Sequence, residues 1–251
     1  MKRLLFAALV LFTVSAVFAD DTKPIKVLLV AGGCCHDYSK QKDILKEGLE
    51  KRANLKIDIV YSPDTTTKPN FPIYGNPDYA KGYDVVIHDE CAADINTQSI
   101  VEGVLKPHQD GIPGVNLHCA MHCYRIGNPN EKAIPGTPHA LWFEYLGLQS
   151  SGHDKQLPIA ITFTDKNSPI TKGLTDWTTI GEELYNNVQI LTGQALAHGV
   201  QMRPAKQKQA DGTEIDIEKP FDYVVAWTNM YQGKTRVFST TIGHNDKTVA
   251  D

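Results

Sequence analysis

A near-continuous apolar run close to the start of the chain constrains the fold most. Ile25–Ala31 reads IKVLLVA and ends in two glycines, the pattern of a strand buried on both faces of a parallel sheet. Ser39 is a candidate N-cap, and apolar residues follow it at helical spacing. Leu55–Tyr61 then alternates polar and apolar residues, as a second strand does. The segment predicts a β-α-β unit and hence an α/β protein.

The same alternation of strand and helix continues over the next 60 residues or so. Tyr83–Asp89 (YDVVIHD) is predicted as a third strand. Asp94–His108 is predicted as a helix that stops before Pro107, and Gly114–Leu117 as a fourth strand. The order β-α-β-loop-β-α-β predicts a parallel sheet with helices on both faces.

Patterns in the second half of the chain are weaker. Ala140–Leu148 predicts a short helix, and Leu157–Thr164 a strand. Lys206–Glu218 is polar and predicts an exposed hairpin or loop, while Tyr223–His244 predicts two strands around Gly233. No helix is predicted after the last of these strands. We therefore expect a domain that lacks a closing C-terminal helix, or one in which another element covers that face.

The first 19 residues have the composition of an export signal. Lys2 and Arg3 precede a short apolar stretch that ends in a small-residue cleavage site. We expect a signal peptide over residues 1–19, with an uncleaved membrane anchor as the alternative. Residues 20–251 then form one domain, exported to the periplasm or the extracellular space. No later segment is long and apolar enough to span a membrane.

Net charge and cysteine content exclude several classes of function. Without Lys2 and Arg3, 23 basic residues stand against 29 acidic ones, a net charge of −6, and no basic run of five residues occurs. Nucleic acid and anionic membrane surfaces are therefore poor partners. The five cysteines match no disulfide scaffold; one bridge is feasible, and at least one thiol stays unpaired or pairs between chains. These cysteines are Cys34, Cys35, Cys91, Cys119 and Cys123.

Histidines follow several of the predicted strands. His36 follows the first strand, His88 ends the third, His118 follows the fourth and His244 follows the last. Ligands of open α/β sheets bind at the carboxyl ends of the strands. Each histidine alone is more typical of an ordinary structural residue, but together they favour a site at that edge.

The stretch Gly114–Cys123 (GVNLHCAMHC) admits three interpretations. In a helix His118 and His122 share one face, but Cys119 and Cys123 lie about 100° away, which excludes a zinc finger. One or two of these residues can still bind a metal together with distant histidines. Alternatively, a strand-to-helix elbow exposes His118, or Cys119 if the turn lies one residue later. In the third interpretation both cysteines are buried packing residues.

Two later spots carry further candidate residues. His153 lies in the glycine-flanked stretch SGHD, and Glu182 and Glu183 precede Tyr185 in GEELY. In a strand, two adjacent carboxylates point to opposite faces, so only one of them reaches a site while the other is solvated. Such a carboxylate can act as a base or orient an imidazole.

Several segments together resemble the ThuA-like (trehalose utilisation) domain, which has the class I glutamine amidotransferase-like fold. The resemblance rests on the order and spacing of VLLVAGGCCHDY, GVNLHCA, WFEYLGLQSSGHD, DKNSPITKGL, EELYNN and VVAWTNMYQGKTRVFSTTIGH. It implies a flavodoxin-like three-layer sandwich with a mostly parallel central sheet. It also implies a role in carbohydrate catabolism, often alongside oxidoreductases that make 3-keto sugars. The positions that match family features are His36, His118, His153, Glu183 and His244.

The resemblance leads to one functional hypothesis. We expect an exported enzyme that acts on sugars or 3-keto glycosides, of hydrolase, lyase or isomerase type. His118, His153 and His244 are the candidates for binding a divalent metal ion, with Glu183 as base or orienter. Glutaminases of this fold keep a cysteine at the elbow; this chain has His118 there, so glutaminase activity is not expected.

Two alternatives remain open from the sequence. The first is a non-catalytic carbohydrate-binding module, in which aromatic side chains that we expect in the core would instead stack on sugars. These are Trp142, Tyr145, Trp227 and Tyr231. The second is a Cys-dependent hydrolase with Cys119 as nucleophile.

Overall fold

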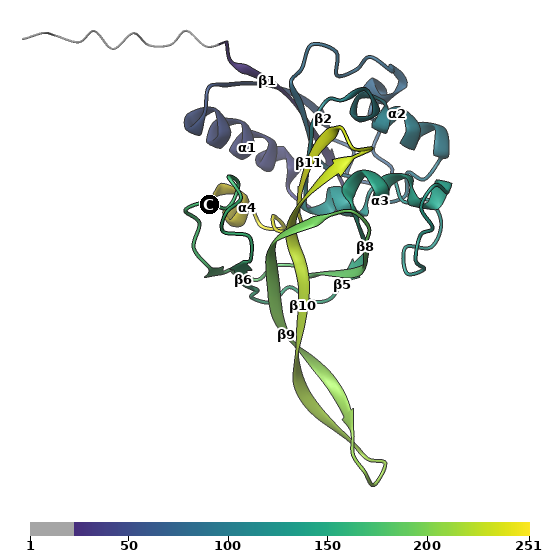
Figure 1. Ribbon diagram of the computed structural model, residues 1–251, viewed down its shortest axis with the longest axis vertical. Coiled ribbons are helices and arrows are strands. Elements are labelled where there is room, and N and C mark those ends of the chain that lie inside the picture. The colour runs from purple at the N-terminus through teal and green to yellow at the C-terminus, as the bar shows by residue number, and fades with distance from the viewer. Residues whose placement is uncertain (1–22) are drawn as a thin grey trace, which may run out of the picture.

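The computed structural model describes residues 23–251, which form a nine-stranded mixed sheet and a separate two-stranded sheet (Figure 1). The expected signal peptide lies outside the described residues. The large sheet has the order β2-β1-β3-β4-β11-β10-β9-β6-β7, and the small sheet pairs β5 with β8. The strands are β1 (Ile25–Gly33), β2 (Leu55–Ser62), β3 (Val85–Cys91), β4 (Gly114–Leu117), β5 (Leu148–His153), β6 (Ala160–Phe163), β7 (Trp177–Thr178), β8 (Tyr185–Ile190), β9 (Gln194–Lys208), β10 (Glu214–Tyr231) and β11 (Thr235–Thr240).

The first half of the large sheet is parallel. β1 pairs with β2 on one side and β3 on the other, and β4 joins β3 to β11, all in parallel register. After β1 the chain adds β2 on one side of β1, and then adds β3 and β4 on the other side. Ligands of such sheets bind where the strand order changes direction in this way. This arrangement confirms the predicted β-α-β-loop-β-α-β order and the α/β class with a parallel core.

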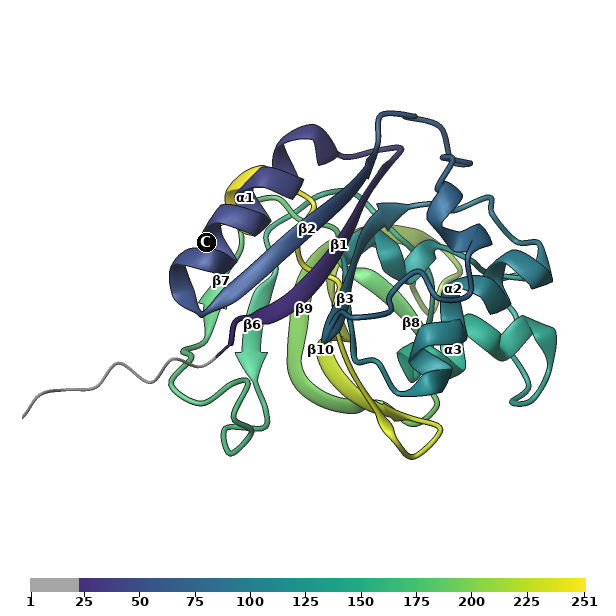
Figure 2. The ribbon, with the colours of Figure 1, turned by 90° about the horizontal axis from the view of Figure 1, so that it is seen from above.

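Helices cover both faces of the parallel strands. They are α1 (Tyr38–Arg52), α2 (Gln98–Asp110), α3 (Leu141–Leu146) and α4 (Asp246–Ala250). Figure 2 shows α1 on one face and α2 and α3 on the other. The side chains of β1 point alternately to the two faces. Leu29 packs with Leu45 of α1 in one apolar cluster, and Val30 packs with Val104 of α2 in another. These are the three layers that the resemblance implied.

The second half of the sheet is antiparallel. β10 pairs antiparallel with β11 and β9, and β6 pairs antiparallel with β9 and β7. Beyond the pair Arg203 and Lys219, β9 and β10 leave the body of the protein as a two-stranded arm (Figure 1). The arm includes the predicted hairpin at Lys206–Glu218.

One predicted helix end is wrong, and one short helix was not predicted. α2 does not stop before Pro107 but continues to Asp110, where Gly111 in the left-handed conformation ends it. Proline in the last turn costs one backbone hydrogen bond, and only three more helical residues follow it. After β11 a helix that the sequence did not predict, α4, contacts α1. The side chain of Asn245 caps α4 by accepting from the backbone N–H of Lys247.

The four aromatic residues of the carbohydrate-binding alternative lie in the core. Trp142, Tyr145, Trp227 and Tyr231 are all buried. The indole nitrogens of Trp142 and Trp227 donate to the carbonyls of Ala120 and Leu146, so their polar edges are also satisfied within the protein. These rings present no face on which a sugar could stack, which removes the observation that favoured a binding module. Between residues 23 and 251 no helix has the length and apolarity needed to cross a membrane.

Candidate functional site

Three histidines meet where β1, β4 and β11 end. His36 follows β1, His118 follows β4, and His244 comes four residues after β11. The ring centroid of His36 lies 4.6 Å from that of His118 and 4.7 Å from that of His244. The site therefore lies at the carboxyl edge of the parallel strands, as the sequence predicted.

Unusual backbone conformations bring these loops close together. His118 has φ = +44°, an uncommon conformation for a residue with a side chain, and so occupies the tip of the predicted elbow. At the end of β1, Gly33 has φ = +102°, and a Cβ there would lie 2.2 Å from the carbonyl oxygen of Cys91. Only glycine fits this contact. It lets the chain leave the sheet beside β3 and carry His36 toward the elbow.

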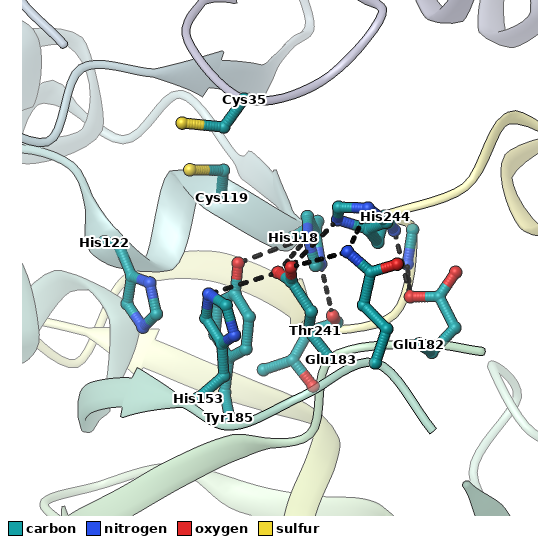
Figure 3. Close-up of polar contacts among 12 residues, drawn as sticks. Cys35, His118, Cys119, His122, His153, Glu182, Glu183, Tyr185, Thr241 and His244 are labelled. Carbon is teal, nitrogen blue, oxygen red and sulfur yellow. Dashed lines mark hydrogen bonds and ion pairs between the residues drawn. The ribbon is translucent and has the colours of Figure 1, made fainter. Parts of the chain in front are cut away.

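A single carboxylate, that of Glu183, contacts three histidines (Figure 3). Its Oε2 lies 3.2 Å from Nε2 of His118 and 3.3 Å from Nε2 of His153, and its Oε1 lies 3.2 Å from Nδ1 of His244. Burial alone would raise the pKa of Glu183, but the contacts with His118 and His244 lower it well below its usual value. The carboxylate is therefore ionised at neutral pH. Its contact, in turn, raises the pKa of His244.

The tautomer of His118 follows from its neighbours. Nδ1 lies 2.6 Å from the backbone oxygen of Thr241, which only accepts, so Nδ1 donates. In a neutral imidazole Nε2 is then a lone pair, and the Tyr185 hydroxyl, 3.2 Å away, donates to it. The Glu183 carboxylate faces the same Nε2 and is also an acceptor. The contact of this carboxylate with Nε2 becomes favourable when a cation, either a proton on Nε2 or a metal ion, lies between the two groups.

Four potential ligand atoms gather at this point. One atom from each of four residues lies within 4.8 Å of all the others; the residues are His36, His118, Glu183 and His244. Burial, helped by the two neighbouring histidines, lowers the pKa of His36 to about 3, so its imidazole is neutral. Nδ1 of His36 is buried without a hydrogen-bond partner. A neutral imidazole with a free nitrogen is the form that binds metal ions.

His153 differs from the metal ligands that the sequence suggested. It contacts Glu183 from the solvent side. It does not belong to the group of four possible ligands, whose third histidine is His36. Its Nδ1 lies 2.9 Å from the carbonyl oxygen of Asp154, and its ring stacks on Tyr185. The structure thus brings all five predicted residues together, while their catalytic role remains a prediction.

Glu182 corrects one expectation. The sequence suggested that one of the two adjacent glutamates would be solvated, but both are buried, because they lie in an irregular segment before β8 and not in a strand. The Glu182 carboxylate accepts the backbone N–H groups of Gly243, His244 and Asn245 at 3.4, 3.0 and 3.1 Å. It therefore fixes the loop that presents His244.

Gln156 and Tyr185 are site residues that the sequence reasoning missed. The amide nitrogen of Gln156 lies 3.3 Å from Oε1 of Glu183 and 2.8 Å from Nε2 of His244. Tyr185 contacts His118 through its hydroxyl and stacks on His122 through its ring. The only signal for Tyr185 was its position two residues after Glu183, and Gln156 gave no signal.

The cysteines form two disulfides, where the sequence allowed one. Cys34 pairs with its neighbour Cys35, Cys91 pairs with Cys119, and Cys123 stays free and buried. Cys119 is thus neither a nucleophilic thiolate nor a simple packing residue, and a Cys-dependent hydrolase at this position is excluded for the oxidised protein. Cys123 does pack in the core, as predicted.

A second polar cluster is separate from the site. Glu90 at the end of β3 accepts the hydroxyls of Tyr74 and Tyr124 at 2.7 and 2.8 Å and contacts Nδ1 of His88 at 2.9 Å. His88 in turn lies 3.0 Å from His108 of α2 through their Nε2 atoms. All these side chains are buried in the main core, so the histidine that ends the third predicted strand serves packing and not the edge site.

A cavity of about 510 Å³ lies elsewhere, lined among others by Val85, Gly114 and Val237. These residues stand at or near the beginnings of β3, β4 and β11, so the cavity is at the opposite edge of the parallel strands. The residues that line it, among those the structure describes, include no histidine and no carboxylate, and we place the candidate site at the carboxyl edge on chemical grounds.

Comparisons with known proteins agree with this fold. A ThuA-like protein from Parabacteroides merdae has a TM-score of 0.59 and 19% identity, covering 88% of this chain and 80% of its own. A ThuA-like protein from Bacteroides uniformis has a TM-score of 0.59 and 15% identity, covering 94% and 89%. A search among curated proteins gives no match. The ThuA family model, described as trehalose utilisation, matches residues 26–251, and the chain belongs to this family.

Proposed function

We propose that the protein is an exported carbohydrate-processing enzyme whose site binds a divalent transition-metal ion. The ligands would be His36, His118, His244 and Glu183. The observation that carries this proposal is the contact between the Glu183 carboxylate and the lone pair of His118 Nε2, 3.2 Å apart. A metal ion satisfies both acceptors at once and also uses the buried, unpartnered Nδ1 of half-buried His36.

The donor set fits such an ion. Three imidazoles and one carboxylate are ligands that zinc and neighbouring metals accept. The Nδ1 of His118 donates to the Thr241 carbonyl, which is how proteins commonly orient a metal-binding histidine and fix its tautomer. When bound, a divalent ion would polarise a carbonyl or hydroxyl oxygen of the sugar.

Proton transfer is best assigned to His153. Its Nδ1 is held by the Asp154 carbonyl, so its Nε2 is the atom that gains or loses a proton. Glu183, whose pKa is lowered, is a weak base but stabilises the imidazolium of His153 at 3.3 Å. His153 is also the exposed histidine of the site, so it can meet a substrate that arrives from solvent.

The substrate class rests on family membership. Trehalose utilisation ties the family to carbohydrate use. A keto sugar is the most suitable substrate for this site, since the hydrogen next to its carbonyl becomes acidic and His153 can remove or return it. Export is supported by the two disulfides, because such bonds persist in oxidising compartments.

Metal content separates the proposal from a metal-free site. We expect about one ion per chain in protein reconstituted with zinc, manganese, iron or nickel and then desalted. His118→Ala and His244→Ala should reduce the content to background. His198→Ala is the matched control, because His198 pairs with Asp222 on the sheet and takes no part in the site. Wild-type protein that retains none of these metals would overturn the proposal.

Proton exchange tests the chemistry. We expect the protein to exchange the hydrogen beside the carbonyl of a 3-keto glucoside for deuterium, followed by NMR in D₂O. His153→Ala should bind metal as the wild type does and lose this exchange by a factor of about 10² to 10⁴. If His153→Ala keeps full exchange, the proton carrier is another residue.

A further inference from the structure

Four cysteines converge beside the histidine site; we call Cys34, Cys35, Cys91 and Cys119 the cysteine cluster. They come from the end of β1, the end of β3 and the elbow after β4. The sulfur atoms of Cys34 and Cys91, which belong to different disulfides, lie 3.5 Å apart. Those of Cys34, Cys35 and Cys91 all lie within 4.8 Å of one another.

We propose that the cysteine cluster is a thiol–disulfide exchange site that reacts with small thiols and switches between two pairings. The first pairing is the observed one, Cys34–Cys35 with Cys91–Cys119. The second is Cys34–Cys91 with Cys35–Cys119. Exchange occurs when a thiolate reaches a disulfide sulfur, so sulfur contacts between two disulfides are the geometric requirement.

Access to the cluster is through one residue. Cys35 is exposed, whereas the other three members are buried, at 2 to 7% exposure. A small thiol from solvent can therefore attack Cys35 but cannot reach the second disulfide directly. Cys35 also has φ = +82°, a strained backbone conformation for a residue with a side chain. The exposed bond is thus the one at which exchange begins.

The reaction is balanced in three steps. The small thiolate bonds to Sγ of Cys35, the Cys34–Cys35 bond breaks, and the electron pair leaves on Cys34. The Cys34 thiolate bonds to Sγ of Cys91, 3.5 Å away in the observed structure, and the Cys91–Cys119 bond breaks with the pair on Cys119. The Cys119 thiolate then bonds to Sγ of Cys35 and expels the small thiolate, which is regenerated.

The last step is supported by the orientation of the two side chains. In Figure 3 the side chains of Cys35 and Cys119 lie next to each other on neighbouring segments, and their sulfur atoms point in the same direction. No oxidant or reductant is consumed, because two disulfides are present before and after. The result is a new bond between the residue before His36 and the residue after His118.

The exchange therefore moves a cross-link onto the site. In the observed pairing, the Cys34–Cys35 bond joins two neighbours in the loop of His36 and links that loop to no other segment. The Cys91–Cys119 bond links the elbow of His118 to β3. In the second pairing these two loops are tied to each other. A ring nitrogen of His36 already lies within 4.8 Å of the sulfur atoms of Cys91 and Cys119, so the change occurs in contact with the site.

Tryptic peptides report the pairing directly. Trypsin does not cleave Lys106–Pro107, so residues 27–40 carry Cys34 and Cys35, and residues 82–125 carry the other three cysteines. Folded protein is incubated with a substoichiometric amount of glutathione or cysteamine, denatured at mildly acidic pH with excess N-ethylmaleimide present so that buried Cys123 is also blocked, and digested without reductant. Without thiol we expect the two peptides to separate, with Cys123 blocked. With thiol we expect them to be linked, with Cys123 still blocked.

Variants identify the route. Cys123→Ser should behave as the wild type, since the free thiol takes no part. Cys35→Ser leaves Cys34 as a thiol beside Cys91 and should give the linked peptides without added thiol. The proposal is overturned if thiol treatment leaves the peptides separate, if linkage consumes Cys123, or if it occurs only after denaturation. Because the readout is a mass, it is independent of metal content and sugar turnover.

Discussion

The carboxylate of Glu182 holds three consecutive backbone N–H groups of the loop that carries His244. Glu182→Gln replaces one acceptor oxygen by a donor that faces another donor. We expect the free energy of unfolding to fall by about 1.5–3 kcal/mol, the usual range for hydrogen bonds to a buried charged group. Urea unfolding measures this. Glu214→Gln, at an exposed position on the arm, is the control and should change stability by less than about 0.5 kcal/mol.

The site shows which residues a sequence can reveal. His36, His118 and His244 could be selected because strand ends converge at one edge of a parallel sheet. His153 and Glu183 required the family resemblance as well. Gln156 could not be found, and Glu182 was noted only as one of two adjacent carboxylates, because their partners lie 88 and 62 residues away in the chain and a single sequence gives no sign of such pairs. The pairing of Cys91 with Cys119, 28 residues apart, was unknown for the same reason.

The end of β1 tests how backbone conformation positions the site. A Cβ on Gly33 would meet the carbonyl of Cys91 at 2.2 Å, whereas one on Gly82, whose φ is also positive, would meet nothing within 4 Å. Gly82→Ala should cost about 1–2 kcal/mol from conformation alone. Gly33→Ala should cost at least about 3 kcal/mol, because the strand must also shift. Equal losses in urea unfolding would show that the contact with β3 is unimportant.

The C-terminal end of α2 carries a pH-dependent contribution to stability. Burial and the neighbouring His88 lower the pKa of His108 to about 3, while an unfolded histidine titrates near 6.5. The native state therefore excludes a proton that the unfolded state binds. This contribution is complete above pH 6.5 and is lost as the pH falls from 6.5 toward 3, by at most about 5 kcal/mol.

His108→Gln tests this contribution. Urea unfolding across that pH window should show a smaller acid loss of stability in the variant than in the wild type. Some loss should remain, since the pKa of His36 is also lowered to about 3 by burial. Parallel pH profiles for the two proteins would contradict the assignment to His108.

At the scale of the whole molecule, the parallel half of the sheet was predictable, whereas in the antiparallel half the sequence predicted the strand at Leu157–Thr164 and the hairpin around Gly233 but not the order of the strands. Apolar runs such as Ile25–Ala31 identify strands buried on both faces, and the helices between them dictate parallel pairing. Strands β6 to β10 are short, mixed in polarity or partly exposed, so their sequence does not specify which neighbour they join. The arm is the extreme case, since residues 204–218 of its outer part are exposed or half-exposed.

Removal of the arm should leave the site intact. Residues 204–218 are exposed or half-exposed, and Arg203 and Lys219 are paired across the ribbon just before them. Replacement of residues 204–218 by Asn-Gly closes a two-residue hairpin at that pair. We expect the free energy of unfolding to change by less than about 1 kcal/mol and metal content to be unchanged. A large loss of either would show that the arm supports the body of the protein.

The site is assembled from both halves of the sheet. His36 and His118 follow strands of the parallel half, and His244 follows the last strand. His153 ends β5 of the two-stranded sheet, and Glu183 lies just before β8 of the same sheet. No contiguous piece of the chain contains a working subset of these groups. The candidate site is therefore complete only when both sheets are in place and the loop that carries His244 is held by Glu182.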